Sequence, residues 1–347
     1  MIAGLKLLGT HIERVTGDGL YGDDLVITPG PSPVADVSID VGLAGTAMRF
    51  LPFVAALGNA RVHFDGDPHA RMRPMRETIE SLRALGAQVD DGGSGTLPFT
   101  VIGAGALEGG DLTIDASRSS QFVSALLLAA PRFTRGLMLK HEGDRVPSVP
   151  HIEMTLATMR ARGVAAKPIA DSSWVVSPGP ISGITIEIEP DLSNAAPFLA
   201  APLVAGGSVT IESWPSDTTQ VGALLPELLK RMGATVSVSN GRCTVSAQRG
   251  YLQGGRFTGG TLDLGHAGEL SPTFAVLGAV CDSPLTITGI GHTRGHVTDR
   301  LEALQTNLRR LGVECTTTDD SITVSPADPS ALHPCEWEAY ADRKSVV

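Results

Sequence analysis

Residues 82–89, LRALGAQV, show how this chain is built: a helix ends, one glycine follows, and a strand begins. A glycine just past a helix is the expected left-handed cap. The pattern occurs five times, with its glycine at Gly9, Gly86, Gly163, Gly233 and Gly312. The intervals between these glycines are 77, 77, 70 and 79 residues. The sequence therefore predicts a repeated unit with a period of about 75 residues.

A second element recurs between these glycines. It consists of a short strand, a polar turn and an alanine-rich apolar helix. The copies cover residues 37–58, 112–131, 184–207 and 262–283, and a fifth begins at 335–342. Strands that alternate with helices predict an α/β protein. A solenoid is the competing interpretation, but units this long with buried-looking helices fit compact domains better.

Both ends of the chain interrupt the repeat. The first repeat glycine is only residue 9, and the last polar turn stops before its helix. We therefore expect the first unit to lack its N-terminal part and the last to be incomplete, with marginal stability as a consequence.

Composition excludes several classes of protein. The 347 residues carry a net charge of −10, which argues against nucleic-acid binding. The apolar runs fall short of a bilayer span, and the N-terminus does not resemble a signal peptide. The cysteines form no C-x-x-C pair and have no metal spacing with histidine; they are Cys243, Cys281, Cys315 and Cys335. These features favour a soluble, cytoplasmic protein with reduced thiols and no membrane partner.

Three polar turns in the first half of the chain have features of an anion site. Gly45 and Thr46 open one apolar helix, and the stretch 115–122, DASRSSQF, opens another. Helix N-termini offer free N–H groups and favour negative charge. The run 69–76, HARMRPMR, adds three arginines, whose planar forks match phosphate and carboxylate groups. Ordinary caps, an over-capped helix and a solvated basic face are the alternatives for these three stretches.

The second half adds candidates of the same kind. Glu269 opens an apolar helix and could be a cap or a general base. Two histidines and two arginines gather in residues 292–300, and the proline-stiffened loop 146–151 contains Ser148 and His151. Together the turns predict a cleft between two domains for a small, multiply anionic substrate.

Four motifs, LAGTAMRF, DGDPHARMRPM, SSQF and RGHVTDRL, resemble the enolpyruvyl-transferase family, and the resemblance extends over nearly the whole chain. It implies two domains, 1–187 and 188–347, forming an inside-out α/β barrel of repeated βαβαββ units, with five of six unit marks visible. The reaction implied transfers the enolpyruvyl group of phosphoenolpyruvate to the 5-hydroxyl of shikimate 3-phosphate, in aromatic amino-acid biosynthesis. The resemblance also implies a monomer that uses no metal or organic cofactor.

The same resemblance assigns residues to each substrate. Shikimate 3-phosphate is expected to contact Ser119, Ser120, Gln121, Ser148, Glu269 and His296. Phosphoenolpyruvate is expected to contact Gly45, Arg73, Gln121 and Arg300. Glu269 is expected to take the proton of the 5-hydroxyl, and His151 replaces a frequent tyrosine of the family.

Departures from the family pattern bear on activity. The N-terminal lysine segment and the C-terminal Asp-His-Arg-Met motif of the family are missing, and Val297 stands where the family has a proton-transferring glutamate. We therefore expect a poor or inactive enzyme. One alternative is the sister transferase that acts on UDP-N-acetylglucosamine, but the loop 64–74 lacks the cysteine expected there. The other is a catalytically dead, ligand-binding relative.

Overall fold

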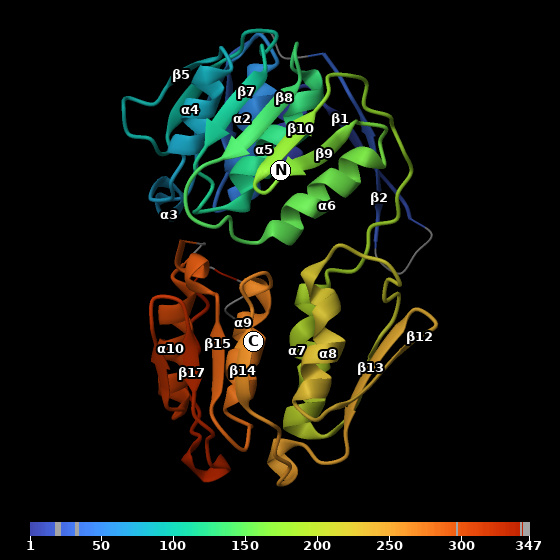
Figure 1. The fold of residues 1–347 in the computed structure, drawn as a ribbon, viewed down its shortest axis with the longest axis vertical. Helices are drawn as coiled ribbons and strands as arrows, with labels where there is room; N and C mark the ends of the chain where they lie inside the picture. The colour runs from blue at the N-terminus through green and yellow to red at the C-terminus, as the bar shows by residue number, and fades with distance from the viewer. Residues whose placement is uncertain (18–21, 32–34, 296–297, 341, 343–347) are drawn as a thin grey trace. The chain divides into compact units, whose positions relative to one another are not determined.

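The computed structural model of the chain describes residues 1–17, 22–31, 35–295, 298–340 and 342 (Figure 1). The chain forms two compact units. Unit 1 comprises Met1–Val146 and Thr155–Ile184, and unit 2 comprises Pro147–Met154 and Thr185–Val347. The first half of one helix, α6 (Val149–Arg160), thus belongs to unit 2 and the second half to unit 1.

All five repeat glycines adopt the left-handed conformation predicted from the sequence, with φ between 78° and 101°. They follow the helices α1 (Ile2–Leu7), α4 (Arg76–Ala84), α6 (Val149–Arg160), α8 (Leu225–Arg231) and α10 (Arg300–Leu311). They precede the strands β1 (His11–Val15), β5 (Gln88–Asp90), β9 (Ala166–Ala170), β12 (Thr235–Ser239) and β16 (Cys315–Thr317). The helix–glycine–strand repeat is therefore confirmed.

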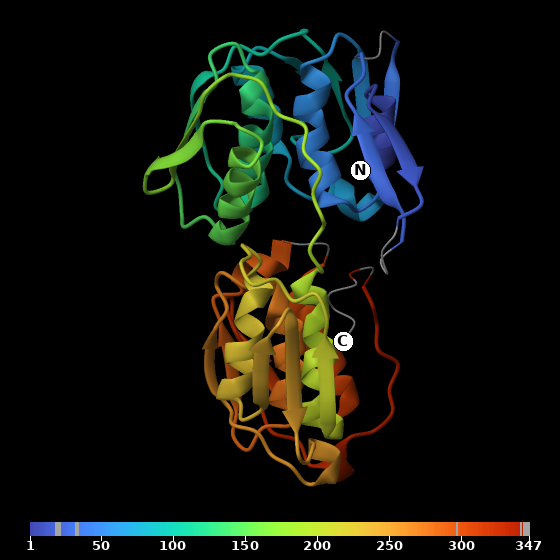
Figure 2. The same ribbon diagram turned by 90° about the vertical axis from the view of Figure 1, so that its right-hand side faces the viewer.

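Unit 1 contains two four-stranded sheets with one topology (Figures 1 and 2). Their orders are β3-β4-β6-β5 and β7-β8-β10-β9. The new strands are β3 (Val37–Asp40), β4 (Arg61–Asp65), β6 (Phe99–Ile102), β7 (Gly110–Ile114), β8 (Leu137–His141) and β10 (Ser173–Val176). The first two strands of each sheet are parallel, which requires a crossover helix. Helices α2 (Gly45–Ala56) and α5 (Ser120–Ala129) provide it, and β1 pairs with β2 (Asp24–Thr28) in a separate hairpin.

Unit 2 repeats the topology. One sheet has the order β14-β15-β17-β16, with a parallel first pair joined through α9 (Ser271–Gly278). The other has the order β11-β13-β12 and follows α7 (Leu192–Ala205). The new strands are β11 (Gly207–Ile211), β13 (Arg242–Ala247), β14 (Gly260–Asp263), β15 (Leu285–Thr288) and β17 (Ile322–Val324). The fold is therefore mixed α/β with repeated small sheets, as predicted, and the described strands form open sheets rather than one closed barrel.

One expected strand is absent. The alternating isoleucines of the 184–207 copy predict a strand before α7, but the structure assigns no strand between residues 177 and 191. Ile184, Ile186 and Ile188 are exposed there. Period-2 alternation predicts a half-buried strand only where a neighbouring strand supplies hydrogen bonds. Within the described residues no strand pairs with this segment, so the prediction is wrong.

The alanine-rich helices form the interior of each unit. In unit 1, α2 and α5 lie side by side behind the β7–β10 sheet in the view of Figure 1. Four side chains of these helices are almost fully buried: Met48, Leu51, Phe122 and Leu126. Burying a side chain of this size contributes about 1.5–3 kcal/mol. The two helices contact each other, and Arg49 of α2 donates to Ser119 and Gln121 at the start of α5.

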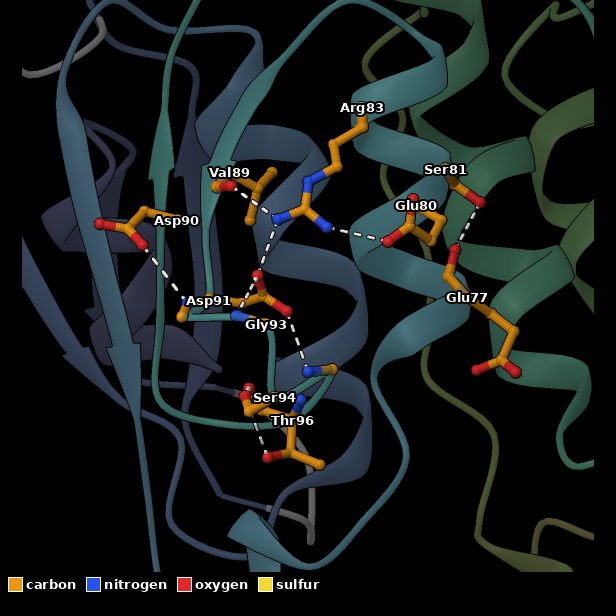
Figure 3. Close-up of polar contacts among 12 residues, drawn as sticks. Glu77, Glu80, Ser81, Arg83, Val89, Asp90, Asp91, Gly93, Ser94 and Thr96 are labelled. Atoms are coloured by element: carbon orange, nitrogen blue, oxygen red, sulfur yellow. Dashed lines mark hydrogen bonds and ion pairs between the residues drawn. The ribbon is translucent and has the colours of Figure 1, made fainter.

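The glycine-rich turn between β5 and β6 fixes the start of α4 (Figure 3). The Asp91 carboxylate accepts hydrogen bonds from the N–H groups of Gly93 (3.1 Å) and Gly95 (2.9 Å). It also pairs with the Arg83 guanidinium at 2.7 Å. The Gly95 carbonyl in turn accepts from the N–H of Met75, the residue that precedes α4. This turn therefore holds the loop in which the basic run of residues 69–76 lies.

The remaining short helix, α3 (Pro68–Arg71), begins at Asp67, whose side chain caps it by accepting from the N–H of His69 at 2.8 Å. In the described part of the chain, no helix is both long enough and apolar enough to cross a membrane.

Candidate active site

Helix α2 begins at Gly45 without a side-chain cap. Thr46, which the sequence suggests as a cap, does not accept such a bond, so the first N–H groups of α2 have no partner within the helix. A Cβ on Gly45 would lie 2.8 Å from Arg73 Nη2 and 3.0 Å from Gln121 Oε1. Only glycine therefore allows the arginine and the glutamine to lie against this helix end.

Helix α5 is capped by Ser119, whose Oγ accepts from the N–H of Gln121 at 3.3 Å. The cap predicted for this stretch is confirmed, and one serine is enough to form it. Ser120 is 4% exposed and Gln121 is half-buried, so both are held inward in the first turn. The extra polar side chains of DASRSSQF are therefore not needed for capping.

Of the three arginines in the basic run, one belongs to this group. Arg73 is 9% exposed, and its Nη1 donates to the Leu43 carbonyl, just before α2, at 3.1 Å. Arg71 is exposed and pairs with Asp65 at 2.7 Å, and Arg76 is exposed near Gly95. The solvated-face alternative is thus correct for two of these arginines and wrong for Arg73.

Arg49 also belongs to this group, although the sequence suggests only a surface arginine beside a cap. It is 3% exposed, and its Nη1 donates to Gln121 Oε1 at 2.8 Å and to Ser119 Oγ at 3.2 Å. Burial, followed by the charge of Arg73, lowers the pKa of Arg49 to about 9. One signal was available: Arg49 is the only charged residue between Asp40 and Arg61.

A second residue that sequence reasoning missed is His141, at the end of β8. Its Nδ1 accepts from the N–H of Ala116 at 3.0 Å, so its other nitrogen, Nε2, carries the proton donated to the Asp144 carbonyl. The imidazole therefore holds the loop that precedes α5 in place. A histidine at a strand end is too common a feature to reveal this role from sequence.

Unit 2 contains the other predicted residues. Glu269 lies in the short 3₁₀ segment Gly268–Leu270, and its Oε1 is 3.4 Å from Nε2 of His151, a residue that also belongs to unit 2. The Glu269 side chain does not cap the segment. Ser148 adopts the left-handed conformation, with φ of 51°, just before α6. The structure thus brings Glu269 and His151 together.

Arg300 is 6% exposed at the start of α10, after the cap Asp299. Its Nε donates to Asp342 Oδ2 at 2.6 Å, and its Nη2 lies 3.3 Å from Oδ1. Its Nη1 is buried and has no hydrogen-bond partner among the described residues. His296 and Val297 lie outside the described residues.

His292, from the same histidine- and arginine-rich stretch, lies against Gly268, the residue before Glu269. A Cβ on Gly268 would lie 2.8 Å from His292 Nε2. Burial lowers the pKa of His292, which favours its neutral form.

Two groups of predicted residues result. Unit 1 brings together Gly45, Arg73, Ser119 and Gln121, with Ser120 beside them, and unit 2 contains Ser148, Glu269 and Arg300. The unit 1 group carries two buried arginines, hydroxyl groups and a helix N-terminus, a combination suited to an anionic ligand. No cluster of three or more histidine, cysteine, aspartate or glutamate side chains within the described ranges could hold a metal ion.

Comparison with known proteins agrees with this chemistry. Residues 1–345 match the family model described as EPSP synthase (3-phosphoshikimate 1-carboxyvinyltransferase). The chain is 47% identical over 351 aligned positions to a 3-phosphoshikimate 1-carboxyvinyltransferase of Kocuria rhizophila, covering 100% of this chain and 77% of that protein. This chain therefore belongs to the EPSP synthase family of enolpyruvyl transferases.

Solved structures support the fold. One EPSP synthase of Acinetobacter baumannii superposes with a TM-score of 0.72 at 24% identity, over 94% of this chain and 72% of that one. A second structure of EPSP synthase from the same organism gives a TM-score of 0.72 at 22% identity, over 99% of this chain and 78% of that one.

Proposed function

We propose that this chain transfers the enolpyruvyl group of phosphoenolpyruvate to the 5-hydroxyl of shikimate 3-phosphate, releasing phosphate, at a reduced rate because Val297 stands where the family has a proton-transferring glutamate. The observation that carries the proposal is the 47% identity over the whole chain to a 3-phosphoshikimate 1-carboxyvinyltransferase. The unit 1 group supports it, because buried arginines and hydroxyl donors suit phosphorylated substrates.

The residue roles are part of the proposal. Ser119, Ser120, Gln121, Ser148, Glu269 and His296 would bind shikimate 3-phosphate, and Gly45, Arg73, Gln121 and Arg300 would bind phosphoenolpyruvate. The buried Nη1 of Arg300 supports its role, since a carboxylate or phosphate oxygen would satisfy it. The short bonds of Arg300 to Asp342 would hold the guanidinium in place for that contact.

The chemistry proposed is addition followed by elimination. Glu269 would accept the proton of the 5-hydroxyl, whose oxygen then forms a bond to C2 of phosphoenolpyruvate while the methylene carbon takes up a proton from solvent. In the elimination, the C2–O bond to phosphate breaks and the methyl carbon returns a proton to solvent, which restores the double bond. His151, 3.4 Å from Glu269, would orient that carboxylate. The positive charge of the buried Arg73 would stabilise the phosphate as it leaves.

The domain boundaries, the arrangement of the repeated units, the cellular location and the oligomeric state are part of the same proposal. We infer domains at 1–187 and 188–347, in the inside-out barrel arrangement of βαβαββ units that the resemblance implies. A cytoplasmic monomer is the state we expect, and light scattering coupled to size-exclusion chromatography would measure its mass.

The replacement Glu269→Gln tests the role of the carboxylate. Glutamine keeps the size of the side chain but cannot take a proton, so we expect phosphate release to fall about 10²–10⁴-fold. Release of phosphate from phosphoenolpyruvate, with and without shikimate 3-phosphate, measures this, and calorimetry measures binding. If the unaltered chain binds neither substrate, the proposed function is wrong; if Glu269→Gln retains full rate, Glu269 is not the base.

A further inference from the structure

Arg49 is a buried residue of unit 1 to which the proposed residue roles assign no substrate. It lies at the second turn of α2, and one of its terminal nitrogens, Nη1, contacts both Gln121 Oε1 at 2.8 Å and Ser119 Oγ at 3.2 Å. The guanidinium carbon also lies 4.7 Å from the centroid of the Phe122 ring. Three side chains at the start of α5, those of Ser119, Gln121 and Phe122, thus contact this one arginine.

The contact with Gln121 fixes which way its amide points. A guanidinium has only donors, so the amide atom 2.8 Å from Arg49 Nη1 must be the oxygen, Oε1. The amide nitrogen, Nε2, is then directed away from Arg49. Arg49 occupies one of the two lone pairs of Oε1, and the NH₂ group that Gln121 directs away from Arg49 is left to donate hydrogen bonds to a ligand.

The contact with Ser119 has the same effect on a hydroxyl. Ser119 Oγ accepts from Arg49 Nη1 at 3.2 Å and from the N–H of Gln121 at 3.3 Å. A hydroxyl oxygen has two acceptor sites, and these two contacts occupy both. What remains available on Ser119 is its O–H donor.

We infer that Arg49 is a positioning residue that sets the hydrogen-bond polarity of this turn, so that Ser119 and Gln121 both act as donors and select a ligand oxygen that can only accept, as in a phosphate. The inference rests on the proposed function for the identity of that ligand, shikimate 3-phosphate. It adds a role for a residue that is too buried, at 3% exposure, to be a surface cation.

The groups around Arg49 explain how its side chain keeps this orientation. Arg73 and Glu77 are the charged groups that act on it most strongly, one unfavourably and one favourably. The Phe122 ring covers one face of the guanidinium and restricts its rotation. The planar group is therefore held with Nη1 toward α5.

A first experiment needs no ligand. Arg49→Met keeps the apolar stem and removes every donor, whereas Arg83→Met removes an arginine of the same unit that contacts Glu80, Val89 and Asp91 instead. The heteronuclear NOE of the Gln121 side-chain NH₂ group reports its mobility, and Gln121→Leu assigns the signal. We expect a rigid NH₂ in the unaltered chain and in Arg83→Met, and a mobile one in Arg49→Met. An equally rigid signal in Arg49→Met overturns the inference.

A second experiment measures shikimate 3-phosphate affinity by calorimetry in a double-mutant cycle. Arg49→Met and Gln121→Leu should each weaken binding about tenfold, since each removes a hydrogen bond involving a charged group or ligand. Because Arg49 acts through Gln121, the double variant should lose much less than the roughly hundredfold product. A fully multiplicative loss would mean that Arg49 contacts the ligand independently, and would overturn the positioning role.

Two outcomes separate this inference from the proposed function. If the unaltered chain does not bind shikimate 3-phosphate, the proposed function fails, and the NOE measurement still decides the role of Arg49. If Arg49→Met does not fold, Arg49→Lys replaces it: an ammonium without the planar fork cannot hold both acceptors in the same geometry, so partial mobility of the Gln121 NH₂ group is expected. Unchanged mobility and affinity in Arg49→Lys would contradict the inference.

Discussion

Gly45 is a residue whose missing side chain has a consequence for binding. Its backbone lies where a Cβ would be 2.8 Å from one terminal nitrogen of Arg73 and 3.0 Å from the amide oxygen of Gln121. Contacts this short force the neighbours to move. Its φ is not in the left-handed region, so the glycine is required here by space and not by backbone conformation.

Replacing Gly45 by alanine should therefore impair binding more than folding. Alanine favours a helix start by up to about 1 kcal/mol over glycine, which offsets the local crowding. We expect the KM for phosphoenolpyruvate to rise about tenfold, because small displacements of binding groups are costly, while the melting temperature changes little. Steady-state phosphate release and a thermal melt measure the two effects. An unchanged KM would show that the displaced side chains do not bind this substrate.

Asp91 illustrates a residue whose role is structural. Its side chain is 5% exposed and accepts from Gly93, Gly95 and Arg83 (Figure 3). The hydrogen bond from Arg83, with those from the two backbone N–H groups, lowers the pKa of Asp91 from 3.8 to about 2. Protonation therefore removes stability when pH falls.

The expected pH dependence has a defined sign. A carboxyl with a folded-state pKa below its unfolded value stabilises the protein above pH 4, and this contribution is lost as pH falls from about 4 to about 2. The full loss should be about 2 kcal/mol, and about half of it, roughly 1 kcal/mol, should have occurred by pH 3. Urea unfolding of the unaltered chain and of Asp91→Asn, at pH 7 and at pH 3, measures it. Asp91→Asn should already be destabilised at pH 7 and should lose less on acidification; equal losses in both would contradict this role.

At the scale of the elements, the five helix ends form a natural comparison. Gly86 and Gly312 have nearly the same φ, 99° and 95°. A Cβ on Gly86 would have no neighbour within 4 Å, whereas one on Gly312 would lie 2.5 Å from the Ala331 carbonyl oxygen. The two positions therefore separate the cost of backbone strain from the cost of a steric clash.

Alanine at these two sites should destabilise the protein to different extents. Gly86→Ala should cost about 1–2 kcal/mol, the penalty for a side chain in the left-handed region. Gly312→Ala should cost more, because a backbone oxygen cannot move aside as a flexible side chain can. Chemical denaturation of the two variants under one condition gives the comparison. Equal costs would mean that the segment around Ala331 relaxes freely.

At the scale of the whole molecule, ligand binding should appear as stability. A ligand that binds only the folded state at 100 times its Kd stabilises it by about 2.7 kcal/mol. We expect shikimate 3-phosphate to raise the melting temperature, and shikimate, which lacks the phosphate, to raise it less. Differential scanning calorimetry with both compounds measures this. Equal shifts would show that the phosphate is not what unit 1 recognises.

Much of the fold could be predicted because it follows from local chemistry. The left-handed turn after a helix favours glycine, so the five turns that the structure confirms can be located from the glycines in the sequence. The prediction of a strand at residues 184–189 was wrong because it depends on more than local chemistry. Alternating apolar residues can be seen in the segment itself, but a strand also needs a neighbouring strand that is distant in the sequence. Ser119 as a cap was predictable from its place before an apolar helix.

The sequence by itself determined the repeat, the mixed α/β class and the residues with anion chemistry, since each depends on neighbours in the chain or on spacing along it. Only the tertiary structure decided which of these residues meet. Arg71 and Arg73 are two positions apart, yet one pairs with Asp65 at the surface and the other lies buried beside Gly45. Arg49 and Gln121, 72 positions apart, are joined by a hydrogen bond. Burial and contact across elements depend on how helices pack, and packing is a property of the folded chain.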